Sequence, residues 1–304
     1  MEHTANISRR QRYRGSLLGL AAGDAVGTTL EFKTPGSFTP ISDMVGGGPF
    51  GLHPGQWTDD TSMALCLAHS LVECQGFDAS DQMQRYLNWS RHGYMSSNGR
   101  CFDIGVTVSE ALSRFLQTGE PLAGSSNPFA AGNGCIMRLA PVVIYFSPNL
   151  ADSLEYAALS ARTTHGAKEC VDATTYFASL LHTAYAGQSK AEILASELYP
   201  PTTKKVLAIA QQHYRHKTPP EIKGTGYVID CLEAALWSFA STDNFRDAVL
   251  TAANLGDDAD TTAAVVGQIA GAYYGEQGIP EAWLSKLVMR SEMEQLADQL
   301  GQKN

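Results

Sequence analysis

The sequence has no apolar run long enough to cross a membrane and no concentration of basic residues. A membrane-spanning helix needs roughly 20 apolar residues, and none of the hydrophobic stretches approaches that length. Lysine and arginine number 22 against 31 acidic residues, which gives a formal net charge of -9. Because nucleic acids are bound by clustered cations, this composition argues against a membrane or a nucleic acid as the primary partner.

Paired cysteine motifs are also missing. The six cysteines are scattered without any C-x-x-C spacing, which predicts small core residues in a reducing compartment and no disulfide framework. Arginines precede an apolar stretch near the N-terminus, SRRQRYRGSLLGLAAGD, but Asp24 ends that stretch too early for a secretion signal. We therefore expect a cytoplasmic protein.

The alternation of apolar and polar residues that is typical of strands is scarce, and apolar residues recur mainly at helical spacing. The 304 residues are 44% hydrophobic, enough for a sizeable core. Apolar residues from Met63 to Val72 mark one face of a helix that ends near Gly76. Similar patterns predict helices over residues 9–23, 80–91, 105–117, 152–162, 168–186, 190–197, 203–214, 227–240, 244–254, 260–275 and 280–299.

Glycine and proline gather in two stretches, residues 33–56 and 119–134, which predicts long loops that carry function. Neither stretch has the composition of a linker, and no repeat of fixed period is present. We expect a single all-α domain over residues 1–304, with residues 1–8 as a flexible N-terminus.

Two short segments, TDDT at 58–61 and GDDADTT at 256–262, place carboxylates and threonine hydroxyls directly before a predicted helix. One such residue is enough to cap a helix, and the helix N-terminus stabilises a nearby carboxylate by about 0.3–1 kcal/mol. The first segment supplies two aspartates and the second supplies three, which is more negative charge than caps require. Two like charges about 4 Å apart repel by about 4 kcal/mol at a surface-like dielectric, so these clusters call for a cation.

A hard divalent cation suits these ligands best. Carboxylates, hydroxyls and water form the oxygen shell of magnesium or manganese, whereas zinc usually recruits histidine or cysteine, which both clusters lack. The pattern leaves open whether the two clusters meet in space. The helix predicted after the second cluster is rich in small residues that permit close packing, namely Ala263, Gly267, Ala270 and Gly271.

Five further segments accompany the acidic clusters: GLAAGDAVGTTLEF at 19–32, CFDIGVT at 101–107, GNGCIMRLAPV at 132–142, THGAKECVDA at 164–173 and GYVIDCLEAALW at 226–237. On these seven collinear segments, almost the entire chain resembles the ADP-ribosylglycohydrolases. That family includes the dinitrogenase reductase-activating glycohydrolases and the ADP-ribosyl-acceptor hydrolases. The resemblance implies a single-domain orthogonal helical bundle with a cleft that holds a binuclear centre of two Mg²⁺ or Mn²⁺ ions.

The resemblance also implies a function, the removal of ADP-ribose from modified protein side chains, with arginine as the expected acceptor and ADP-ribose as the product. By motif match, the metal ligands would be Thr58, Asp59, Asp60, Asp258, Asp260 and Thr261. The implied catalytic residues are Asp103, Glu31 and Asp60, with Asp103 as the first choice for general acid and base and Glu31 as its rival. The implied substrate contacts are Phe129, Asn133, Gly134, Met137, His165 and Tyr227.

Within the resemblance, the glycines around Asn133 let backbone N–H groups approach a diphosphate, and Tyr227 is placed to stack on adenine. The sequence departs from the family pattern at Asp257, where many members have glycine, and at Val106, where a polar residue is common. These departures leave the acceptor preference open.

Three alternatives therefore stay open. The same metal site would serve a hydrolase of another ADP-ribose conjugate, linked to serine, to acetate or to a nucleic-acid end. A non-catalytic protein would instead bind ADP-ribose, or block a toxin as an immunity protein. A metal-dependent phosphoesterase is a third alternative, although such helical enzymes usually include histidine among their ligands.

Overall fold

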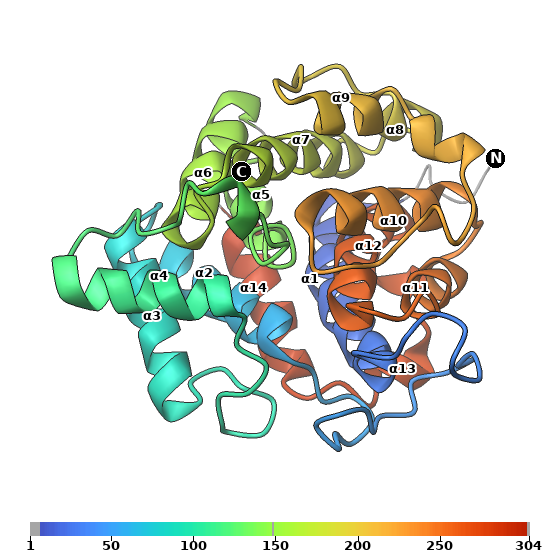
Figure 1. The fold of residues 1–304 in the computed structure, drawn as a ribbon, viewed down its shortest axis with the longest axis horizontal. Coiled ribbons are helices and arrows are strands. Elements are labelled where there is room, and N and C mark those ends of the chain that lie inside the picture. The colour runs from blue at the N-terminus through green and yellow to red at the C-terminus, as the bar shows by residue number, and fades with distance from the viewer. Residues whose placement is uncertain (1–6, 148, 303–304) are drawn as a thin grey trace.

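The described residues, 7–147 and 149–302, form fourteen α-helices in the computed structural model (Figure 1). The helices are α1 (Arg9–Gly27), α2 (Asp59–Glu73), α3 (Ala79–His92), α4 (Val106–Thr118), α5 (Ala140–Phe146), α6 (Leu150–Thr164), α7 (Lys168–Tyr185), α8 (Lys190–Leu194), α9 (Lys204–Ala210), α10 (Val228–Ala240), α11 (Phe245–Ala253), α12 (Ala259–Tyr274), α13 (Glu281–Leu284) and α14 (Arg290–Gly301). Short 3-10 helices lie at Thr28–Leu30, Pro128–Ala130, His213–His216 and Glu276–Gly278. No β-strand occurs in these two ranges, which confirms the predicted all-α class.

Local sequence signals set many of the helix ends. The Ser8 side chain accepts a hydrogen bond from the Gln11 backbone N–H, and the Gln11 side chain accepts one from the Ser8 backbone, so a capping box starts α1. Asp78 is the N-cap of α3, and its side chain accepts hydrogen bonds from the backbone N–H groups of Ser80 and Asp81. Gly93 and Gly119 end α3 and α4 in the left-handed conformation that glycine adopts without strain.

Helices α1 and α12 lie antiparallel in backbone contact, seen in Figure 1 as the blue and orange-red helices at the centre. A Cβ atom built on Gly19 would lie only 2.3 Å from the carbonyl oxygen of Gly267. One built on Gly23 would lie 2.1 Å from that of Ala263. The facing pairs repeat every four residues: Gly15 with Gly271, Gly19 with Gly267, Gly23 with Ala263 and Gly27 with Ala259. This contact places the end of α1 beside the start of α12.

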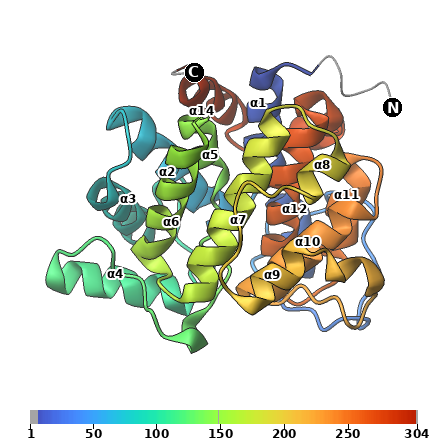
Figure 2. The ribbon, with the colours of Figure 1, turned by 90° about the horizontal axis from the view of Figure 1, so that it is seen from above.

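The other helices surround this pair in two groups. In Figure 2, α3 and α4 lie on one side and α8 to α11 on the other, with α7 between them. The main apolar core includes α1, α7, α10 and α12, and a smaller core forms where α2, α3 and α4 meet. None of the helices in the described ranges is both long and apolar enough to span a membrane.

The prediction of one helix over residues 280–299 is wrong, because this range contains two helices, α13 and α14. The loop before α2 interrupts it: Val288 N–H donates to Gly55 O at 3.1 Å, and Trp57 Nε1 donates to Val288 O at 3.3 Å. Met289 then takes a left-handed conformation with φ 56° before α14 begins. The spacing of apolar residues predicts one continuous helix here, but the contact with the loop before α2 divides it into two.

Other elements also differ from the prediction: α8 ends at Leu194 and not at residue 197, and the helix predicted over 203–214 is α9 followed by a 3-10 helix at His213–His216. Helix α1 continues past residue 23 to Gly27, because Gly23 and Gly27 serve helix packing and do not stop the helix. Helix α5 was not predicted; it is a short, buried and apolar helix with Pro141 in its first turn. The predicted flexible N-terminus falls mostly on residues 1–6, which lie outside the described residues, while Ser8 is held as the cap of α1.

We predict that Gly19→Ala lowers the free energy of unfolding by about 3 kcal/mol, because the added methyl group has no room against the backbone of α12. Urea denaturation followed by circular dichroism measures this change. The matched control is Gly76→Ala, whose Cβ atom would meet no atom within 4 Å. Equal stability of the two variants would contradict the proposed role of the contact.

Candidate active site

The two acidic clusters face each other where α2 and α12 begin. The Thr58 hydroxyl lies 3.2 Å from Asp260 Oδ2, and the Thr261 hydroxyl donates to Asp60 Oδ1 at 3.2 Å. Thr58 and Asp258 occupy the N-cap positions of α2 and α12. The question that the sequence left open is therefore answered, because segments some 200 residues apart in the chain form one cluster.

Glu31 joins this cluster from the end of the 3-10 helix Thr28–Leu30, which follows α1. Its Oε2 atom accepts hydrogen bonds from the backbone N–H groups of Ala259 at 3.0 Å and Asp260 at 3.4 Å, at the start of α12. One carboxylate oxygen each from Glu31, Asp258 and Asp260 lie within 4.8 Å of one another. These oxygens form a compact set that can surround a cation.

The cluster is buried and lacks hydrogen-bond donors for all its oxygens. Asp60 is fully buried, and its Oδ2 atom has no hydrogen-bond partner among the described residues. The Thr58 hydroxyl lies near both Asp24 Oδ1, at 3.0 Å, and Asp260 Oδ2, but it carries one proton and can donate to only one of them. A buried carboxylate oxygen without a partner is costly. The donor set, oxygen only and rich in carboxylates, fits a hard divalent cation.

Crowding changes the protonation of these acids. Burial, followed by repulsion from Asp260, raises the pKa of Asp24 and of Asp258 to about 7. The same two causes raise the pKa of Asp103 to about 9. Burial and neighbouring carboxylates also raise the pKa values of three more acids, Glu31, Asp59 and Asp60. Without a cation, several of these groups keep a proton at neutral pH, and a bound cation would displace those protons.

Asp24 is a site residue that the sequence analysis missed. Its Oδ1 atom accepts from the Thr58 backbone N–H at 2.9 Å, and its Oδ2 atom accepts from the Thr61 N–H at 3.1 Å and hydroxyl at 2.6 Å. Asp24 therefore fixes the first turn of α2 to α1. The sequence does contain an indication of this role, because Asp24 is the one charged residue in the small and apolar stretch LLGLAAGDAVG. Acidic residues are rarely buried unless they have a partner or a function.

A cleft of about 350 Å³ opens over the acids. Most of the predicted site residues line it: Glu31, Asp59, Asp103, Asn133, Gly134, Met137, His165, Asp258, Asp260 and Thr261. Thr58 and Asp60 lie fully buried against this set. Asn133 also contacts the acids directly, because its Nδ2 atom donates to Asp258 Oδ2 at 3.0 Å.

His165 lies under the glycine loop at the side of the cleft. A Cβ atom on Gly134 would lie 2.7 Å from His165 Cε1, so only glycine fits there. Burial, with Arg138 as the second cause, lowers the pKa of His165 to about 3, so the imidazole is neutral. Arg138 donates to the Thr164 hydroxyl at 2.6 Å, and that hydroxyl lies 2.8 Å from His165 Nδ1. Because arginine can only donate, the Thr164 hydroxyl accepts from Arg138 and uses its own proton to donate to His165 Nδ1. Nδ1 is then the acceptor, and the proton of the neutral imidazole lies on Nε2.

The remaining two predicted substrate residues, Phe129 and Tyr227, lie in an adjoining pocket of about 530 Å³. Phe129 is 99% exposed. The Tyr227 hydroxyl donates to Glu169, and the Lys205 ammonium group donates to the same hydroxyl at 2.6 Å. The two pockets share Thr107, Gly132 and Gly226, so together they form one continuous groove.

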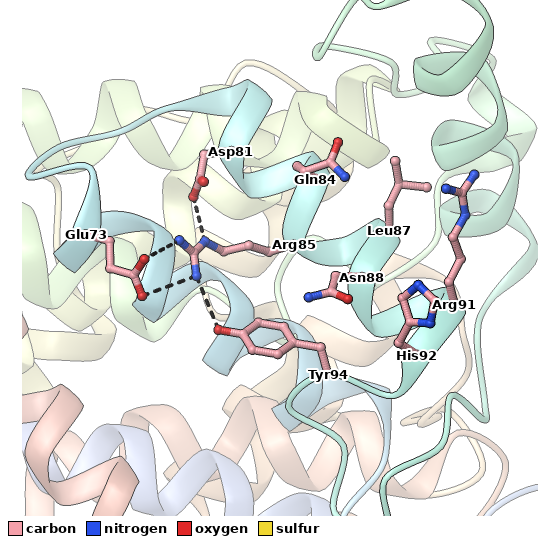
Figure 3. Close-up of a pocket in the computed structure, with 9 residues that line it drawn as sticks. All are labelled: Glu73, Asp81, Gln84, Arg85, Leu87, Asn88, Arg91, His92 and Tyr94. Atoms are coloured by element: carbon pink, nitrogen blue, oxygen red, sulfur yellow. Dashed lines mark hydrogen bonds and ion pairs between the residues drawn. The ribbon is translucent and has the colours of Figure 1, made fainter.

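A separate pocket of about 440 Å³ lies on α3, away from these acids (Figure 3). Arg85 fills one side and is already paired: its guanidinium donates to Asp81 at 2.6 Å, to Glu73 at 2.7 Å and to the Tyr94 hydroxyl at 3.2 Å (Figure 3). Its lining contains none of the predicted site residues.

Comparison with known proteins agrees with this geometry. The profile of the ADP-ribosylglycohydrolase family matches residues 5–304. ADP-ribosylarginine hydrolase Tri1 of Serratia proteamaculans (strain 568) is 46% identical, over 94% of this chain and 78% of its own length. ADP-ribosyl-[dinitrogen reductase] glycohydrolase of Rhodospirillum rubrum is 32% identical, over 94% of each chain. A solved structure, described as an ADP-ribosylglycohydrolase-related protein complex, is similar with a TM-score of 0.87 at 43% identity, covering 97% of this chain and 98% of that chain.

The fold and the cleft define an all-helical protein with a carboxylate-lined cleft. The chain belongs to the ADP-ribosylglycohydrolase family, as its sequence motifs predicted. It is an enzyme of that family, a glycosidase similar to the ADP-ribosylarginine hydrolases.

We predict that Asp24→Asn weakens Mg²⁺ binding at least about tenfold, because an amide has one acceptor oxygen and its NH₂ group would face a threonine N–H. Isothermal titration calorimetry measures the affinity. Asp172→Asn is the matched control: Asp172 also accepts from the backbone and hydroxyl groups of two threonines, Thr202 and Thr203, but away from the cleft. Both variants should lose stability; an equal loss of Mg²⁺ affinity would contradict the assignment.

The raised pKa values also predict a pH dependence. Between the ordinary value of 3.8 and about 7, folded Asp24 and Asp258 hold protons that the unfolded chain has released. The stability of the metal-free protein should therefore fall as the pH rises from about 4 to about 7. Saturating Mg²⁺ should raise the melting temperature at pH 8 and have little effect at pH 5. Scanning calorimetry with EDTA and with Mg²⁺ tests this, and equal stabilisation at both pH values would refute it.

Proposed function

We propose that this protein is a magnesium-dependent hydrolase that releases ADP-ribose from ADP-ribosylated arginine side chains of proteins in the cytoplasm. The observation that carries the proposal is the meeting of the two acidic clusters in a cleft that continues into an aromatic pocket. The name of the Serratia relative supports arginine as the acceptor. The runner-up keeps the same site and cleaves another ADP-ribose conjugate.

The shape of the groove supports a long, two-part substrate. The acidic cleft takes the ribose that carries the acceptor, and the glycine loop with Asn133, Gly134 and Met137 takes the diphosphate. Phe129 and Tyr227 take the adenine in the adjoining pocket, where aromatic side chains provide stacking surfaces. The neutral His165 serves as a hydrogen-bond partner for the substrate along the side of the cleft.

The residues fit two divalent cations. Thr58, Asp59 and Asp60 would hold them from α2, and Asp258, Asp260 and Thr261 from α12. Mg²⁺ is proposed, with Mn²⁺ as an equivalent hard cation. When bound, the ions would bind the ribose hydroxyls and orient the attacking water.

Hydrolysis breaks the bond between the anomeric carbon and a guanidinium nitrogen, and water supplies the new oxygen. The bonding electrons leave with the nitrogen, which takes a proton, so the products are ADP-ribose and arginine. Asp103 moves that proton in our proposal, because it lines the cleft and is not among the proposed metal ligands, so its carboxyl group is free for proton transfer. Glu31 is less free for this role, because one of its oxygens holds the start of α12.

We expect Asp103→Asn to lower kcat about 10²- to 10⁴-fold and to keep Mg²⁺ affinity, because an amide cannot transfer the proton. Asp258→Asn should lose activity together with Mg²⁺ binding. Asp257→Asn is the matched control, since its side chain neighbours Asp258 in sequence but does not line the cleft. Chromatography of products released from ADP-ribosylarginine protein, with Mg²⁺ and with EDTA, measures turnover.

Several outcomes of this experiment would contradict the proposal. Release of AMP in place of ADP-ribose would indicate cleavage of the diphosphate. Cleavage of a serine or acetyl conjugate, with arginine-linked ADP-ribose left intact, would support the runner-up. Full activity in EDTA would remove the metal from the mechanism.

A further inference from the structure

Three phenylalanine rings beside the mouth of the cleft have no part in the proposed function so far. Phe32, Phe50 and Phe102 are called here the aromatic row. Phe32 and Phe50 lie in the segment between the 3-10 helix Thr28–Leu30 and α2, and Phe102 lies in the segment between α3 and α4. The ring centroids of Phe32 and Phe50 are 6.3 Å apart, and those of Phe50 and Phe102 are 5.2 Å apart. Phe32 lines the acidic cleft and is 66% exposed. Large apolar side chains that gather at the surface beside an active site indicate a binding surface.

The backbone holds this row against the acids. Phe32 follows Glu31 directly, and Phe102 precedes Asp103. Phe32 and Asp103 have φ angles of 60° and 59°, which residues other than glycine rarely adopt. The Phe32 conformation is fixed by its N–H group, which donates to Asp257 O at 2.8 Å. Strained residues of this kind persist where the surrounding structure fixes them, and they cluster at ligand sites.

The chemistry of the row favours a planar cation. The faces of aromatic rings are electronegative, and the carboxyl groups of Glu31 and Asp103 lie in the adjacent cleft. A guanidinium group stacks on aromatic rings better than an ammonium group does, because it is planar and weakly hydrated. An arginine that carries ADP-ribose keeps this positive charge. A serine or acetyl acceptor offers neither a charge nor a plane.

The position of the row leaves it free for the acceptor. The acidic cleft connects to the aromatic pocket through Thr107, Gly132 and Gly226, and Phe32 is not among these shared residues. If adenine occupies the pocket of Phe129 and Tyr227, the acceptor must leave the cleft by another side. The row provides such a surface beside the acids.

We propose that the aromatic row binds the guanidinium group of the acceptor arginine and thereby selects arginine-linked ADP-ribose over conjugates with neutral acceptors. This inference rests on the proposed function, since it assigns the acceptor end of the same site. Phe32 and Phe50 contact the cation, and Phe102 supports the Phe50 ring from the side of Asp103.

The test uses Phe50→Leu, because Phe50 is not adjacent in sequence to any acid of the cleft, whereas Phe32 follows Glu31 and Phe102 precedes Asp103. This change keeps an apolar side chain and removes the aromatic face. We expect kcat/KM for ADP-ribosylarginine to fall about tenfold, while the affinity for free ADP-ribose stays unchanged. Phe50→Trp should restore activity, because tryptophan provides the stronger aromatic face. Leu198→Ala, at another partly exposed apolar residue, is the control and should change neither quantity.

Two results would overturn the inference: unchanged kcat/KM in Phe50→Leu, or an equal loss of ADP-ribose affinity and arginine-conjugate turnover. A separate binding experiment distinguishes this failure from failure of the proposed function. Methylguanidine, titrated by NMR in the presence of ADP-ribose, should bind the wild-type protein more tightly than methylurea, its neutral counterpart, and Phe50→Leu should remove the difference. If wild-type protein cleaves no arginine conjugate but shows this preference, only the proposed reaction fails. If methylguanidine and methylurea bind equally, the aromatic row is not a guanidinium site.

Discussion

The backbone contact between α1 and α12 determines where Asp24, Glu31 and the aspartates at the starts of α2 and α12 lie. Glycine or alanine at each facing position lets the two helices approach until backbone touches backbone. The register that results sets Asp24 and Glu31, near the end of α1, beside the aspartates that begin α12. Asp24 then holds the first turn of α2, and Glu31 holds the first turn of α12. A larger side chain on this seam would shift both acidic clusters together, which explains why a packing feature controls the chemistry of the site.

The same arrangement concentrates negative charge where water is scarce. Helix N-termini stabilise part of it, because backbone N–H groups of α2 and α12 point at Asp24 and Glu31. Those donors are too few, since one oxygen of Asp60 has no partner among the described residues and several carboxyl groups have raised pKa values. The cluster is therefore a cost to folding unless a proton or a cation neutralises it. Unfavourable local interactions of this kind are typical of functional sites, where residues are selected for binding at a cost in stability.

Much of this architecture could be predicted from the sequence because its signals are local. Apolar residues at helical spacing gave the all-α class, and the crowding of TDDT and GDDADTT indicated an oxygen-ligand site. The small residues of α12 predicted close packing, although the glycines of α1 that complete the contact were not assigned to it. Properties that depend on tertiary contacts could not be predicted. Val288 and Gly55 end the helix expected at 280–299, and the role of Asp24 depends on threonines that lie far along the chain.

The central claim is that one pair of cations is shared between α2 and α12. Crystals grown with Mn²⁺ and examined by anomalous diffraction test it most directly. The account predicts two anomalous peaks in the cleft, with oxygen ligands from both the Thr58–Asp60 segment and the Asp258–Thr261 segment around them. Peaks bound to one segment alone, or none between the two helices at saturating Mn²⁺, would contradict it.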